Sequence, residues 1–261
     1  MLVDHVLVNL QRNLTRLDRL QNRLSSGRRV QYPSDDPASA TLAMRLRSAV
    51  ADNDQYQRNA SAAISWLQTT DSALQDVVQT LHRARELAIS GARGDLPDSA
   101  RQALAEEMDQ LLRHLVDVGN TQHGGRYIFG GFRTDRPPLQ VAATQASTGW
   151  VDRVQYSGTT SVVHWEAEVG PQVSLPVSVA AQEVFGDLMG ASEPELFAQL
   201  RQIRDHLQAG DVNSLSGQDL QWLDEGLDRV LQALSVVGAR QQGLELVSQR
   251  LSSDGLNLKE L

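Results

Sequence analysis

Apolar residues at both ends of the chain recur with alternating steps of three and four, the pattern of a helix with one apolar face. The first stripe comprises Val3, Leu7, Leu10, Leu14, Leu17 and Leu24. The second comprises Leu220, Leu223, Leu227, Val230, Leu234, Val237, Leu244 and Leu251. Stripes of this kind are typical of coiled coils. We expect the two helices to need each other for burial of their leucines.

A long helix is predicted between the two stripes. From Ala38 to Gly91 there is no proline and no earlier glycine, and apolar residues keep helical spacing. An uninterrupted helix there would be about 80 Å long at 1.5 Å per residue. Gly91 and Gly94 end it, and a third helix starts after Pro97 and ends at Gly119. The reversal predicts that the third helix lies back along the second.

Beyond residue 125 the period changes to that of strands. The sequence Gly-Gly-Arg-Tyr-Ile-Phe-Gly-Gly, residues 124–131, predicts a short strand between turns. Residues 163–169 and 173–179 each alternate apolar with polar positions, so each strand should bury one face. Pro176 places the second strand at an edge or a bulge. Helices resume after Gly186, with Ser192 and Glu195 as the expected capping box of the next helix.

The predicted fold class is therefore mainly α with a β insertion: a long antiparallel helical bundle or coiled-coil rod carrying one small outer β domain. Residues 1–137 and 186–261 form the discontinuous helical domain, with a short β-hairpin near 126–134. Residues 138–185 form the inserted β domain, because a domain interrupted by another is the economical interpretation of this order.

The segment 23–37, Arg-Leu-Ser-Ser-Gly-Arg-Arg-Val-Gln-Tyr-Pro-Ser-Asp-Asp-Pro, predicts a joint between two helices. Gly27 ends the first helix, Asp36 is the N-cap of the second, and Pro37 is its first residue. The pair Asp35 and Asp36 could also serve a metal or acid-base chemistry. Adjacent carboxylates rarely converge on one ion without further ligands, so capping is favoured.

Composition argues against several classes of function. The chain has 261 residues, 41% hydrophobic and 5% aromatic content, a formal net charge of -8 and no cysteine. The negative charge disfavours nucleic acid as a partner, and the lack of cysteine removes disulfides and thiolate chemistry. No apolar run approaches the ~20 residues that span a bilayer, so we expect no membrane partner. The first ten residues do not resemble a cleaved secretory signal.

A search for reactive groups yields no catalytic, cofactor-binding or metal-binding set. The six histidines, at positions 5, 82, 114, 123, 164 and 206, lack zinc-site spacing. The paired glycines at 124–125 and 130–131 precede no phosphate-binding motif, so packing is favoured over a phosphate loop. Arg23, Arg28 and Arg29 could attract an anion, although a solvated or partner-facing loop is the simpler interpretation. We expect no enzyme and no cofactor.

Several motifs resemble those of the flagellin superfamily, and within it most closely the family of hook-filament junction proteins, hook-associated protein 3. They are Leu-Ser-Ser-Gly at 24–27, Ser-Asp-Asp-Pro at 34–37, Gln-Tyr-Gln-Arg-Asn at 55–59, Trp-Leu-Gln-Thr-Thr-Asp-Ser-Ala-Leu at 66–74 and Arg-Ala-Arg-Glu-Leu-Ala at 83–88. Filament flagellins usually carry alanine where this chain has Pro37. Pro37 and the Gly-Gly-Arg-Tyr-Ile-Phe-Gly-Gly block favour the junction family.

The resemblance implies a structural subunit of the extracellular flagellum. Such subunits leave through the flagellar type III apparatus without a cleaved signal. Implied partners are copies of itself in a tubular layer, the other junction protein, flagellin and, for the full-length protein, an export chaperone. We expect subunit contacts at two motif-rich segments without chemical purpose, the loop from Ser25 to Ser34 and the hairpin from Arg126 to Phe132. The candidate contact residues are Arg28 and Arg29 in the first segment and Arg126, Tyr127 and Phe129 in the second.

The family pattern also predicts that this polypeptide is trimmed at its termini and stays monomeric in solution. Two alternatives remain open. One is a filament-forming flagellin, and the other, less favoured, is a helical receptor or adhesin whose β domain binds a ligand.

Overall fold

The computed structural model describes residues 2–26, 37–158, 164, 166–189 and 193–260. It divides into two compact units. One comprises the residues up to Gln55 together with those from Ser252 onward, and the other runs from Tyr56 to Leu251. The long helices α2 (Pro37–Gly91) and α7 (Gln218–Glu260) contribute to both units.

The first unit contains helix α1 (Leu2–Ser26), whose apolar stripe is exposed. Leu7, Leu10, Leu14 and Leu17 are between 53% and 56% exposed, and Leu24 is 85% exposed. The helix itself is confirmed. The expectation that each terminal stripe needs the other is wrong for α7, however, because the α7 stripe is buried by helices of its own unit.

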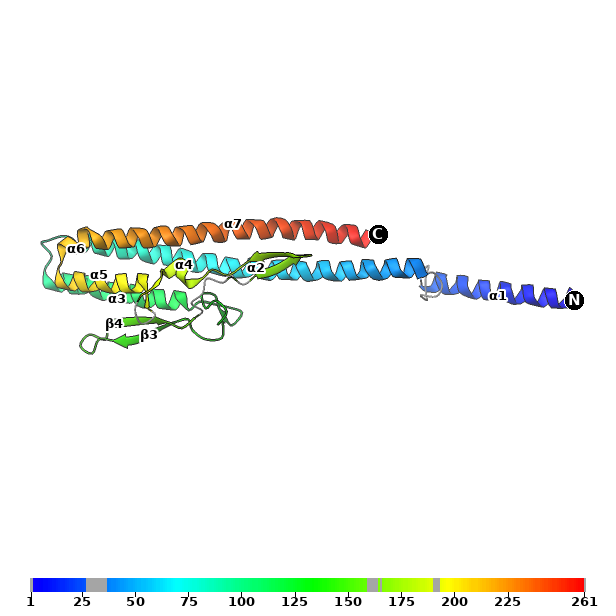
Figure 1. The fold of residues 1–261 in the computed structure, drawn as a ribbon, viewed down its shortest axis with the longest axis horizontal. Coiled ribbons are helices and arrows are strands. Elements are labelled where there is room, and N and C mark those ends of the chain that lie inside the picture. The colour runs from blue at the N-terminus through cyan, green and yellow to red at the C-terminus, as the bar shows by residue number, and fades with distance from the viewer. Residues whose placement is uncertain (1, 27–36, 159–163, 165, 190–192, 261) are drawn as a thin grey trace. The chain divides into compact units, whose positions relative to one another are not determined.

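The hydrophobic core lies in the second unit, where parts of α2 and α7 pack with α3 (Asp98–Gly119) and α5 (Glu195–Ala209). Figure 1 shows α3 and α5 side by side and α7 following α2 through this unit. Core residues from these four helices include Leu67, Leu74, Leu81, Met108, Leu112, Leu115, Leu200, Ile203, Leu207, Leu223, Val230, Val237 and Leu244. They recur at the helical period that the sequence displays, which confirms the amphipathic assignment.

Ion pairs bridge the helices at the edge of this core. Arg83 of α2 contacts Glu107 of α3 at 2.6 Å, and Arg85 of α2 contacts Asp224 of α7 at 2.9 Å. Both pairs are solvent-exposed, so each contributes little to stability. The predicted return of α3 along α2 is confirmed by the first pair, and apolar burial remains the larger stabilising term.

Four antiparallel two-stranded sheets follow α3. They pair β1 (Gln122–His123) with β2 (Arg126–Tyr127), β3 (Leu139–Thr144) with β4 (Val151–Tyr156), β5 (Glu166–Gly170) with β6 (Val173–Pro176), and β7 (Leu188–Met189) with β8 (Glu193–Pro194). Two short helices, α4 (Ala181–Phe185) and α6 (Val212–Ser216), complete the chain. The predicted class, mainly α with a β insertion, is confirmed.

The predicted alternation is confirmed in β5 but is wrong in β6. In β5, Ala167 and Val169 are buried while Glu166 and Glu168 are exposed. In β6, Val173 is 48% exposed, and the pairing ends at Pro176. Proline cannot donate to a ladder, and residues 177–181, which follow it, are all buried, including Ser178. Burial there follows from packing on the unit and not from strand alternation.

The helix ends agree with the glycine and proline signals, with one exception. Gly210 closes α5 in the left-handed region at φ 68°, as expected of a C-terminal glycine. At the other end, α5 begins at Glu195 after Pro194, without a side-chain cap. Glu195 is therefore the first residue of the helix and not the third, as the expected capping box requires, and it pairs with Arg229 at 2.9 Å. Ser192, the other residue of that box, lies outside the described residues.

The β segment shares its core with the helices. Leu139 and Val151 of the insertion belong to the same hydrophobic cluster as Leu115 of α3 and Leu200 of α5. Asn120, the C-cap residue of α3, also donates to the Leu139 carbonyl at 2.8 Å and accepts from the Leu139 N–H at 3.0 Å. The insertion is thus anchored on the helices, and the domain boundaries at residues 138 and 185 stay a prediction.

Gly91 provides a test of how closely α2 approaches α5. A Cβ atom built at Gly91 would overlap the Leu207 side chain, whereas one at Gly94 would meet nothing within 4 Å. We expect Gly91→Ala to lower the free energy of unfolding by about 1–3 kcal/mol through overpacking. Gly94→Ala should change it by less than about 0.5 kcal/mol. Urea unfolding followed by circular dichroism measures both, and equal effects would contradict the packing described.

Candidate functional site

The first segment predicted to contact neighbouring subunits lies largely outside the described residues. Gly27, Arg28, Arg29 and Asp36 all fall there, so their capping and contact roles stay predictions. The flanking helices do end at Ser26 and begin at Pro37, where the sequence places the two helix boundaries.

The second predicted segment is a glycine-turned hairpin followed by a loop. Gln122 pairs with Tyr127 and His123 with Arg126, across Gly124 and Gly125. Both glycines have positive φ, 57° and 79°, which is the conformation of a type I′ turn and strongly favours glycine. Arg126 is exposed and Tyr127 is half-buried. Their side chains are therefore accessible to a neighbouring protein, and their contact role stays a prediction.

The contact role predicted for Phe129 is wrong, because its ring belongs to the core. Phe129 is 0% exposed and packs edge-on against Phe185, with ring centroids 5.4 Å apart. Its carbonyl accepts a hydrogen bond from the Tyr156 hydroxyl at 3.0 Å. Burial raises the pKa of the Tyr156 phenol to about 12, so it remains a donor throughout the physiological range. Phe129 therefore holds the loop on the core, and its ring is not exposed for contact with a neighbouring subunit.

The exposed aromatic residue of the segment is instead Phe132, which is 59% exposed. The predicted contact segment reaches this residue, but the sequence does not single it out. It lines a groove of about 500 Å³ with Ala62, Trp66, His123, Gly124, Arg126, Gly131, Thr134 and Ser178. Helix α2 forms one wall of this groove and the hairpin with its loop forms another.

His123 fixes the hairpin to the α2 wall of the groove. Its Nδ1 lies 2.8 Å from the Thr69 hydroxyl, and its ring meets Trp66 edge-on at 5.6 Å between centroids. These contacts join residues more than 50 positions apart and explain how so short a hairpin keeps a defined place on the helix. Contacts within a single chain thus form the groove, without a second subunit.

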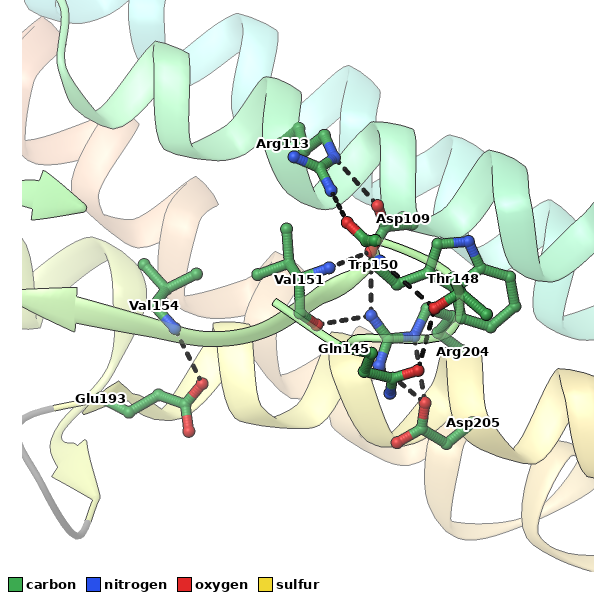
Figure 2. Close-up of polar contacts among 11 residues, drawn as sticks. Asp109, Arg113, Gln145, Thr148, Trp150, Val151, Val154, Glu193, Arg204 and Asp205 are labelled. Atoms are coloured by element: carbon green, nitrogen blue, oxygen red, sulfur yellow. Dashed lines mark hydrogen bonds and ion pairs between the residues drawn. The ribbon is translucent and has the colours of Figure 1, made fainter. Parts of the chain in front are cut away.

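A buried polar cluster positions the neighbouring hairpin β3–β4, as Figure 2 shows. The Arg204 side chain of α5 is 0% exposed and donates to Asp109 of α3 at 2.8 Å and to the Val151 carbonyl at 2.5 Å. The same Asp109 oxygen accepts from the Val151 N–H at 2.7 Å. Arg204 also lies over the Trp150 ring, 5.2 Å from its centroid. We call these four residues, Asp109, Trp150, Val151 and Arg204, the polar clasp.

Further ion pairs surround the polar clasp. Arg113 donates to the second Asp109 oxygen at 2.9 Å and to the Gly149 carbonyl at 2.5 Å, and Asp205 contacts Arg204 at 2.7 Å. On the β8 side, Glu193 accepts from the Val154 N–H at 3.3 Å. Every strong donor and acceptor of the clasp therefore has a partner, which is the condition for burying charge without a large penalty.

Sequence reasoning missed the polar clasp. Asp109 and Arg204 are 95 positions apart. Each is one charged residue on the buried face of a helix, and the apolar residues around it make it hard to recognise in the sequence. The one available signal is that each charge falls among core positions, next to Met108 and Ile203. That signal does not identify the partner.

The described part of the chain contains neither a cluster of side chains that could bind a metal ion nor a helix that could span a membrane. Three or more histidine or carboxylate side chains do not converge at any point there. None of the described helices is long and apolar enough for a bilayer span. The arrangement offers contact surfaces on a rigid support.

Comparison with known proteins gives one family match. The family model described as bacterial flagellin N-terminal helical region matches residues 3–134. Flagellar hook-associated protein 3 of Salmonella typhimurium is 29% identical over 178 residues, covering 68% of this chain and 52% of the relative. Phase 1 flagellin of Salmonella naestved is 32% identical over 145 residues, covering 55% of this chain and 28% of that relative.

Solved structures share the fold. Flagellar hook-associated protein 3 from Legionella pneumophila has a TM-score of 0.71 at 16% identity, covering 84% of this chain and 97% of that one. FlgL from Bacillus cereus has a TM-score of 0.67 at 23% identity, covering 84% and 99%. The chain spans about half the length of the hook-associated relative from Salmonella typhimurium.

The polar clasp predicts a sharp asymmetry between two arginines that share one carboxylate. Arg204→Met leaves Asp109 buried without its main partner, so it should lower the free energy of unfolding by about 3–5 kcal/mol. Arg113→Met removes a side chain that is 45% exposed, and should cost at most about 1 kcal/mol. Chemical denaturation compares the two variants. A similar loss for both would show that burial of Arg204 does not govern the stability.

Proposed function

The chain belongs to the family of the bacterial flagellin N-terminal helical region, and from this premise we propose that it is a structural subunit of the junction between hook and filament. The observation that carries the proposal is the match to hook-associated protein 3 over 68% of the chain. The agreement of its fold with solved hook-associated proteins supports the same assignment.

The mechanical role follows from how the second unit is built. Four helices share one core, and buried side chains in a close-packed interior transmit force with little deformation. The polar clasp and the Phe129 anchor attach the β segment to that body. Load applied to an exposed loop is then passed to the helices. Such a subunit suits a layer between a flexible hook and a stiff filament.

Subunit contacts in this proposal involve both motif-rich segments. Arg126 and Tyr127 are the accessible side chains of the hairpin, and Arg28 and Arg29 are the corresponding candidates of the joint. Partners are copies of the same chain in a tubular layer, the other junction protein on the hook side and flagellin on the filament side. Export through the flagellar type III apparatus, with a dedicated chaperone for the full-length protein, belongs to the same proposal.

A filament-forming flagellin is the second candidate, favoured by the 32% identity to phase 1 flagellin. The coverage of that relative, 28%, is about half of that found for hook-associated protein 3. The two functions differ in stoichiometry. A filament subunit dominates the protein of sheared flagella, whereas a junction subunit is scarce there.

Deletion of the gene provides the functional test. Without the junction layer, flagellin should reach the medium unassembled while hooks remain normal, and swimming should be lost. Immunoblots of the culture supernatant for flagellin, with electron microscopy of the cell surface, measure both outcomes. Restoration by the gene in trans is the control. Normal filaments in the deletion strain would refute the junction function, and loss of flagellin itself would favour the filament alternative.

A further inference from the structure

The hairpin and loop that border the groove at Phe132 carry a net positive charge on a chain that is negative as a whole. The hairpin and its loop, residues 126–136, contain Arg126, Arg133 and Arg136 against Asp135, while the chain has a formal net charge of -8. All three arginines are exposed. Among the described residues, Arg126 has no ion-pair partner. The groove thus combines an exposed aromatic ring with an unpaired guanidinium.

A surface with the complementary character lies on α7 of the same unit. Asp224, Asp228 and Leu231 follow one another at steps of four and three, and Leu246 lies close to four turns further on. This spacing places them on one helical face. Leu231 is 42% exposed and Leu246 is 67% exposed. We call this set the outer stripe of α7.

The outer stripe differs from the buried stripe of the same helix. Buried Val230 directly precedes exposed Leu231, and one residue step turns a helix by about 100°. The apolar packing of α7 therefore does not use Leu231, although Asp224 of the outer stripe pairs with Arg85 of α2. Asp228 is exposed, and no described residue forms an ion pair with it. Exposed leucines beside Asp228, a carboxylate without an ion-pair partner among the described residues, indicate a surface for another protein.

We propose that the groove at Phe132 of one subunit receives the outer stripe of α7 of a second copy of this chain. Leu231 packs on the Phe132 ring, and Asp228 pairs with Arg126. The occupant is a second copy because the same chain supplies both an exposed guanidinium, Arg126, and an exposed carboxylate, Asp228, that have no ion-pair partner among the described residues. The inference rests on the proposed function and specifies one contact of the layer.

The geometry of such a contact accounts for a repeating layer. Groove and stripe are different surfaces, so the contact is heterologous, and each subunit keeps a free groove on one side and a free stripe on the other. Heterologous contacts close into rings or continue as helical arrays. A symmetric dimer would use both surfaces at once and would stop there.

Single cysteines test the contact directly, because the chain contains none of its own. Cells would make Phe132→Cys and Leu231→Cys chains together in place of the native chain, and isolated flagella would be oxidised mildly. A disulfide requires Cβ atoms about 4 Å apart. We expect a covalent dimer only where both variants are present. The matched control replaces Leu231→Cys by Val141→Cys, on an exposed strand residue outside both surfaces.

Exchanging the charges of Arg126 and Asp228 provides an independent test of the same contact. Arg126→Asp or Asp228→Arg alone places like charges together, and each should lower the crosslink yield about tenfold. The two changes in one chain should restore it. A yield no higher than the Val141→Cys control, a dimer from Leu231→Cys alone, or no recovery in the double exchange would overturn the proposal. The gene deletion tests the proposed function separately, so failure of one does not imply failure of the other.

Discussion

The burial of one charged pair sets the arrangement of the second unit. Arg204 and Asp109 have almost no access to water, and each is satisfied by the other and by the Val151 peptide group, with Arg113 and Asp205 as further partners. This requirement brings α3, α5 and β4 to one point. An apolar contact at the same place would permit sliding, whereas directed hydrogen bonds fix both distance and register.

The loop surface depends on that arrangement. With β4 held, Tyr156 reaches the Phe129 carbonyl, Phe129 and Phe185 close the core, and Arg126 and Phe132 lie on either side of the buried residues Ile128 and Phe129. Phe132 and Arg126 are exposed as a result. The surface proposed for subunit contact is therefore a consequence of how the interior is completed. A support of this kind lets a contact loop bear load without rearranging.

Sequence patterns predicted the helices well because glycine, proline and apolar spacing act locally. The ends at Gly91, Gly119 and Gly210 illustrate this. The patterns failed where the outcome depends on residues far apart. The glycine bracket around Phe129 indicates a tight turn but not which aromatic ring enters the core, and the burial of Ser178 follows from packing of the segment after β6. The pairing of Asp109 with Arg204 does not correspond to any periodic pattern in the sequence.

The central claim is that this chain occupies a single layer between hook and filament. The most direct measurement is the position of the chain in isolated hook-filament structures, by electron microscopy with a gold-labelled antibody against it. The account predicts label confined to a narrow band where hook and filament meet. Label distributed along the filament would contradict it.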